Sequence, residues 1–144
     1  MVFDDGVTTR ISENRYHMTT TTGGAARVMS WLEEFLQTEW LNMEVFCTSV
    51  TEQWTVLSVS GPNSREFLSS LTDIDISKEA FPFMKMKEGK VCGIDARIFR
   101  ISFTGELSFE INVPSRYGLF VWNEFMKLGK KYDITPYGTE SMHV

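Results

Sequence analysis

The sequence lacks the features that would assign it to a nucleic-acid or membrane partner. Among its 144 residues, 14 Lys and Arg are outnumbered by 19 Asp and Glu, so the net charge is -5 and no basic stripe is available to neutralise phosphates. Its apolar runs are only a few residues long, whereas a membrane-spanning helix needs about 20. These absences exclude a basic nucleic-acid-binding surface and a membrane-spanning helix.

Cysteine and histidine are also scarce. Cys47 and Cys92 lie far apart and lack the short spacing of metal ligands, so we expect reduced thiols and a cytoplasmic, reducing compartment. His17 and His143 stand outside any metal-ligand or triad spacing and are interpreted as packing or surface residues. No Gly-x-Gly-x-x-Gly occurs, which excludes a dinucleotide-binding unit from this chain.

The first third of the chain predicts strands followed by one helix. Residues 7–11 and 16–21 are rich in β-branched side chains and flank a polar turn at 12–15. Over residues 25–37 the apolar positions recur every three or four residues, which is typical of an amphipathic helix. A further strand is expected at 45–50.

The remaining two thirds predict more strands and two helices. Asn63 is a candidate helix N-cap, with Glu66 three residues later returning the bond, and a last helix is expected over 116–128. Strands are expected over residues 54–59, 90–94, 96–103 and 107–113, with a turn at 93–95. Antiparallel hairpins with helices between them predict an α+β domain whose helices cover one face of an antiparallel or mixed sheet.

The most informative segment, residues 97–113, contains an acidic residue between two alternating strands. Thr104-Gly105 is a turn signal, so Glu106 is expected at the mouth of a tight hairpin, where its carboxylate can accept N–H groups of a ligand. The alternative is an ordinary solvated glutamate. Four aromatic residues are candidates either for the walls around a flat heterocycle or for the core: Trp54, Phe81, Phe83 and Phe103.

Residues 103–110, Phe-Thr-Gly-Glu-Leu-Ser-Phe-Glu, resemble the Tyr-Thr-Gly-Glu-x-Gly-x-Glu signature of the aminomethyltransferase (glycine-cleavage T-protein) family. Phe103 stands in place of the Tyr, and Ser108 in place of the second Gly. In that family the first Glu hydrogen-bonds the pterin ring of tetrahydrofolate. The resemblance therefore implies that Glu106 binds tetrahydrofolate.

Other segments resemble one branch of this family, the folate-binding region of the alpha subunits of heterotetrameric sarcosine oxidases. These segments are residues 18–26, 47–54, 79–84 and 134–144. The family's folate domain is more than twice as long and forms a cloverleaf of three subdomains around a folate channel. The resemblance thus implies that residues 1–144 are a fragment of one such domain, with parts of its first and second subdomains.

The resemblance implies two further site residues. Asp4 matches an Asp that lies near the reactive N10 of folate, where a carboxylate can stabilise an iminium or accept a proton, so Asp4 is the expected catalytic residue. Thr21 matches an Asn that contacts the pterin and is the second expected cofactor-binding residue, beside Glu106. From the residues alone, Asp4 could equally be a solvated terminal acid and Thr21 part of a β-branched edge strand.

The leading functional hypothesis is that the resemblance places the chain in an oxidoreductase that converts sarcosine to glycine, forming 5,10-methylenetetrahydrofolate and hydrogen peroxide. Tetrahydrofolate is the expected cofactor here, with FAD and NAD in other parts of the parent complex. The implied partners are folate, the other subunits and the missing parts of the domain. The chain alone is expected to be inactive and to self-associate.

Two alternatives remain at this stage. One is a glycine-cleavage aminomethyltransferase, a transferase without flavin. The other is a non-catalytic folate-binding module of the same fold, whose members carry a Lys-Gly-Cys-x-x-Gly-Gln-Glu signature that this sequence does not contain.

Overall fold

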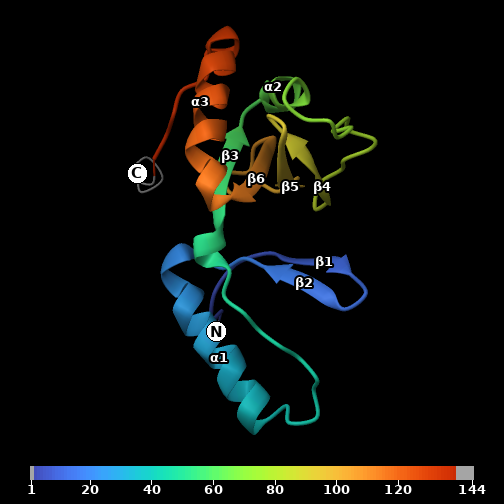
Figure 1. Ribbon diagram of the computed structural model, residues 1–144, viewed down its shortest axis with the longest axis vertical. Coiled ribbons are helices and arrows are strands. Elements are labelled where there is room, and N and C mark those ends of the chain that lie inside the picture. Colours follow the sequence, from blue (N-terminus) through green and yellow to red (C-terminus); the bar gives the residue numbers. More distant parts are fainter. Residues whose placement is uncertain (1, 139–144) are drawn as a thin grey trace. The chain divides into compact units, whose positions relative to one another are not determined.

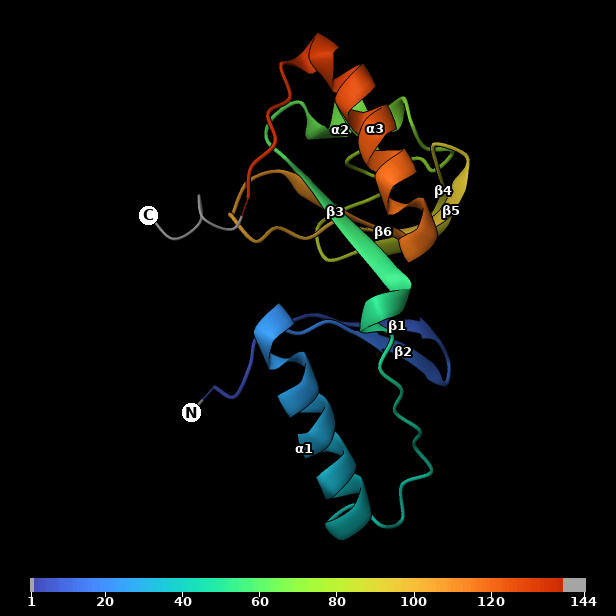
Figure 2. The same cartoon turned by 60° about the vertical axis from the view of Figure 1, so that its left-hand side comes forward.

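The computed structural model describes residues 2–138. The chain forms two compact units, Met1–Glu52 and Gln53–Val144, each with its own helices and strands (Figures 1 and 2). In both views the first unit is coloured blue to cyan and the second green to red.

The first unit contains an antiparallel hairpin of β1 (Thr8–Ser12) and β2 (Arg15–Met18), which confirms the predicted pair of strands. A 3₁₀ turn, η1 (Thr22–Gly24), leads into α1 (Ala25–Thr38), as the apolar periodicity predicts. The strand predicted at 45–50 is wrong, because that segment has no neighbouring strand to complete a ladder.

Aromatic side chains hold the start of the chain on α1. The Trp31 ring lies 4.3 Å from that of Phe35 and 5.7 Å from that of Phe3, between ring centroids. The Arg27 guanidinium lies 4.6 Å from the centre of the Phe3 ring, and its Nη2 donates to the Phe3 carbonyl at 2.9 Å. These contacts fix the backbone just before Asp4.

The second unit is built on a four-stranded antiparallel sheet in the order β3-β6-β5-β4. Its elements are β3 (Trp54–Ser60), α2 (Ser64–Ser69), β4 (Met86–Val91), β5 (Ile94–Phe99), β6 (Ser108–Pro114) and α3 (Gly118–Gly129). Short 3₁₀ turns, η2 (Thr51–Gln53), η3 (Ser115–Tyr117) and η4 (Lys130–Tyr132), precede β3 and flank α3. This architecture confirms the predicted α+β class with an antiparallel sheet.

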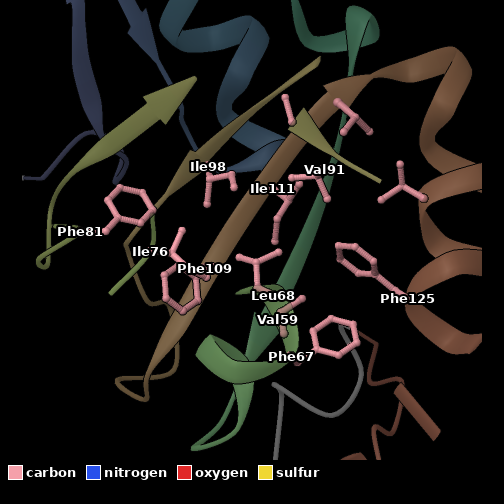
Figure 3. Close-up of a cluster of buried hydrophobic side chains, with 13 residues drawn as sticks. Val59, Phe67, Leu68, Ile76, Phe81, Val91, Ile98, Phe109, Ile111 and Phe125 are labelled. Carbon is pink, nitrogen blue, oxygen red and sulfur yellow. The ribbon is translucent and has the colours of Figure 1, made fainter. Parts of the chain in front are cut away.

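The core lies between one face of this sheet and the helices α2 and α3 (Figure 3). Alternation along β6 decides its composition: Phe109, Ile111 and Val113 are fully buried on the core side, while Ser108, Glu110 and Asn112 lie on the opposite face. The other strands add Val59, Val91 and Ile98, and the helices add Phe67, Leu68 and Phe125.

One local prediction in this unit is wrong, and another is confirmed only in position. The hairpin turn between β4 and β5 is Cys92-Gly93 and not 93–95, with φ angles of 51° and 79°, because a two-residue turn with both φ positive matches the twist of its strands. Asn63 occupies the N-cap of α2 but forms no side-chain capping bond. Its carbonyl instead accepts the Phe67 amide at 2.9 Å.

The cysteines and histidines of the described residues have the following environments. Cys47 and Cys92 are free thiols, and burial raises the pKa of Cys92. His17 is buried in the hairpin, while His143 lies outside the described residues. Within residues 2–138 no cluster of His, Cys, Asp and Glu could hold a metal ion, and no helix is long and apolar enough to cross a membrane.

Candidate functional site

Asp4 and Thr21, predicted as site residues from two separate segments, form one hydrogen-bonded pair. Asp4 Oδ1 accepts the backbone amides of Thr21 at 2.9 Å and Asp5 at 2.8 Å, and Asp4 Oδ2 accepts the Thr21 hydroxyl at 2.9 Å. Thr21 is the residue before η1, so the carboxylate ties the first residues of the chain to the start of the helical segment.

These bonds lower the pKa of Asp4 below its ordinary value of 3.8, chiefly through the Thr21 amide, with a smaller contribution from the positive charge of Arg27. A carboxylate with a lowered pKa is a weak base but a stable negative charge. Of the two chemical roles predicted for Asp4, stabilising a positive charge therefore fits the geometry better than accepting a proton.

Gly24 leaves the space that this carboxylate occupies. A Cβ atom at Gly24 would lie 1.9 Å from Asp4 Oδ2 and 2.6 Å from the Thr21 hydroxyl, so no other residue fits without displacing the pair. At the neighbouring Gly23 a Cβ atom would meet nothing within 4 Å. Of the two glycines, only Gly24 is therefore required by the Asp4–Thr21 pair.

Glu106 lies in the second unit, in a longer connection than the sequence predicts. β5 ends at Phe99 and β6 begins at Ser108, so an irregular loop over residues 100–107 replaces the tight turn; we call this loop the lip. Pairing stops at Phe99 because Arg100 turns away to exchange backbone hydrogen bonds with Met84 and Lys85. Glu106 is exposed near the tip of the lip, after Gly105 at φ +85°.

A cavity of about 550 Å³ lies beside the outer edge of β3, within the size range of small-molecule sites. Phe103 of the lip, Trp122 of α3 and Tyr137 supply aromatic walls. Of the other aromatic residues predicted as walls, Phe81 is fully buried in the core and Phe83 lies beneath Arg100. Of the two alternatives for these aromatic residues, Phe81 therefore matches the core and Phe103 lies in a cavity wall.

Glu110 is the lining residue that sequence reasoning missed. It lies on the polar face of β6 opposite Ser58, it is half-buried, and burial raises the pKa of its carboxyl group above 4.5. No basic side chain among residues 2–138 pairs with it. The signal was present in the sequence, since Glu110 is the second Glu of the signature-like segment, but only the fold shows that this glutamate lines a cavity.

The predicted site residues thus fall into two groups. Asp4 and Thr21 are bonded to each other in the first unit, and Glu106 lies in the second unit with Glu110 and the cavity.

Comparison with known proteins finds relatives that match along nearly the whole chain. Sarcosine oxidase subunit alpha from Corynebacterium sp. (strain P-1) is 56% identical over 146 residues, which cover 100% of this chain and 15% of that protein. The aminomethyltransferase of Thermoanaerobacter sp. (strain X514) is 27% identical, covering 95% of this chain and 36% of its own length. The chain therefore spans a small part of the relatives it matches.

A solved structure gives the same fold. Heterotetrameric sarcosine oxidase from Corynebacterium sp. U-96, in complex with pyrrole 2-carboxylate, matches with a TM-score of 0.73 at 14% identity, covering 92% of this chain and 64% of the matched one. The family described as the GCVT N-terminal domain matches residues 1–144. The chain belongs to the GCVT N-terminal domain family.

Proposed function

We propose that this chain is the tetrahydrofolate-binding segment of a sarcosine oxidase alpha subunit, in which sarcosine is oxidised to glycine with formation of 5,10-methylenetetrahydrofolate and hydrogen peroxide. The 56% identity to such a subunit, against 27% to an aminomethyltransferase, favours the oxidase over the transferase and over a non-catalytic module. FAD and NAD would be bound by other parts of the parent complex, which we place in the cytoplasm.

The observation that carries the proposal is the cavity beside β3 with a half-buried carboxyl group and aromatic walls. A pterin is a flat heterocycle with adjacent N–H donors, and it needs an acidic acceptor and an aromatic surface. Glu110 and Phe103 line the cavity, and Glu106 lies three residues beyond Phe103 on the same lip. The residues present therefore fit tetrahydrofolate.

Each group has a distinct task in this proposal. Glu106 accepts hydrogen bonds from the pterin, and the half-buried Glu110, which lines the cavity, is a second polar group that can bind it. Asp4, held by Thr21, supplies a fixed negative charge for the cationic one-carbon unit. Bound tetrahydrofolate supplies the nucleophilic nitrogens that accept this unit.

The test is folate binding by the parent protein with either carboxylate replaced. Glu106→Gln keeps the shape but turns an acceptor into a donor, so folate affinity should fall roughly tenfold to several hundredfold, or ~1.4–3.5 kcal/mol. The free energy of unfolding should change by less than ~0.5 kcal/mol because the residue is exposed. Isothermal titration calorimetry and chemical denaturation measure the two quantities.

Glu79→Gln is the matched control, because it removes an exposed carboxylate that lies outside both the lip and the cavity lining. Glu110→Gln tests which glutamate accepts hydrogen bonds from the pterin. If folate affinity falls in this variant alone, the pterin contact belongs to Glu110 and not to Glu106. Unchanged folate affinity in both the Glu106 and Glu110 variants would contradict the proposed site.

A further inference from the structure

The lip carries two of the proposed folate contacts and yet is poorly stabilised by its own polar groups. Phe103 and Glu106 are exposed at its tip, and Phe103 is 78% exposed. Arg100 Nε and Ser102 Oγ, both in the lip, are buried without a hydrogen-bond partner among residues 2–138. Buried polar atoms of this kind destabilise a loop, so contacts elsewhere must hold it in place.

One set of contacts holds the C-terminal end of the lip against α2. The Leu107 carbonyl, directly after Glu106, accepts the Gly61 amide at 2.9 Å and the Ser64 hydroxyl at 3.0 Å. Ser64 is the first residue of α2 and is only 3% exposed, so its hydroxyl bond is shielded from water. The position of Glu106 therefore depends on a helix more than 40 residues earlier in the chain.

The N-terminal end of the lip is closed by Arg100. Its Nη1 donates to the carbonyl of Ser108 at 3.1 Å, which bridges the two ends of the loop. Its guanidinium lies 5.4 Å from the ring centre of Phe83 and 5.5 Å from that of Phe109. Burial and the nearby charge of Arg65 lower the pKa of Arg100, so this side chain is held in place at an electrostatic cost.

We propose that Ser64 and Arg100 are positioning residues, which fix the lip so that Phe103 stays in the cavity wall and Glu106 keeps its place on the same loop. This inference rests on the proposed function of the cavity as a folate site. Both side chains donate to backbone carbonyls at the end of the lip, and Ser64 also lines the cavity, so the experiment must separate its action through the lip from a direct contact with folate.

The experiment uses the parent protein with Ser64→Ala. One hydrogen bond to the lip is lost, so folate affinity should fall about twofold to tenfold while oxidation of sarcosine without folate keeps its rate. Amide hydrogen exchange should become faster at residues 103–107. Ser69→Ala is the matched control, because the Ser69 hydroxyl is bonded only within α2, to the Glu66 carbonyl, and folate affinity should stay unchanged.

Testing Ser64→Ala in a variant that lacks the lip contacts shows whether Ser64 acts through the lip. In a Phe103→Ala, Glu106→Gln variant the lip no longer contributes its contacts, so adding Ser64→Ala should leave folate affinity within twofold. An equal loss in both backgrounds would overturn the inference. If the double variant itself binds folate like the unmodified protein, the proposed function of the lip fails instead, and the two failures are thereby distinguished.

Discussion

At the scale of single residues, the geometry around Asp4 separates two neighbouring glycines. Gly24→Ala would place a methyl group on Asp4 Oδ2, whereas Gly23→Ala meets open space. If Asp4 acts as proposed, Gly24→Ala in the parent protein should lower formation of methylenetetrahydrofolate about tenfold to a hundredfold, because the displaced carboxylate loses its alignment. Asp4→Asn should lower it roughly tenfold to a thousandfold.

Gly23→Ala should stay within twofold of the unmodified protein, and flavin reduction by sarcosine should be unchanged in all three variants. Stopped-flow flavin absorbance and a product assay measure the two steps. Equal losses for Gly23→Ala and Gly24→Ala would mean that the Asp4 contact does not carry the effect.

Glu110 gives a pH dependence of stability whose direction follows from its pKa. Burial raises this pKa above 4.5, so the folded state retains a proton that the unfolded state releases. The contribution to the free energy of unfolding is fully present below pH 4.5 and is lost as the pH rises through the raised pKa. In Glu110→Gln the amide side chain does not ionise, so this fall in the free energy of unfolding with rising pH is absent.

Urea denaturation at a series of pH values should therefore show the Glu110→Gln variant gaining stability over the unmodified chain as the pH rises above 4.5. A constant difference between pH 4 and 7 would argue against a buried carboxyl group at this position. Asp4 acts in the opposite sense, since its lowered pKa gives local stability that is lost as the pH falls below 3.8.

At the scale of secondary-structure elements, β3 is an open edge. It pairs with β6 on one side and with no other strand of residues 2–138, and its sequence Trp-Thr-Val-Leu-Ser-Val-Ser carries no charge or proline to prevent pairing between molecules. Val56 on this strand is 50% exposed. We expect the 144-residue chain alone to self-associate through this edge.

Val56→Lys should shift the chain toward the monomer in sedimentation velocity, because a charge on an edge strand opposes strand pairing. Leu119→Lys removes a more exposed apolar residue, 74% exposed on α3, and should leave association unchanged. A monomer at all concentrations in the unmodified chain would contradict the expectation.

At the scale of the whole molecule, the chain covers 15% of the oxidase alpha subunits that it matches at more than half identity. Asp4 belongs to the first compact unit and the cavity to the second. The two groups are therefore tested by different measurements on the parent protein: folate affinity for the cavity, and formation of methylenetetrahydrofolate for Asp4.

Much of the fold is readable from the sequence. The β-branched runs and the 3.6-residue periodicity correctly predicted β1, β2, β3, α1 and the α+β class, because alternation and amphipathicity are local properties of the chain. The candidates Glu106 and Asp4 came instead from resemblance to a known family, Glu106 from its signature and Asp4 from a separate matching Asp. The strand predicted over residues 45–50 failed because its evidence was local. The segment has strand-like composition, but a strand also needs a partner, and this one has none among the described residues.

What the tertiary structure decided concerns contacts between distant residues. The end of β5 at Phe99, the bond between Ser64 and Leu107, and the pairing of Asp4 with Thr21 all join segments that no periodicity relates. The raised pKa of Glu110 likewise depends on burial, which exists only once β3 and β6 pair. Sequence thus determined the element types and the candidate residues, whereas packing determined which carboxylates are held, buried or exposed, because solvation is set by the assembled fold.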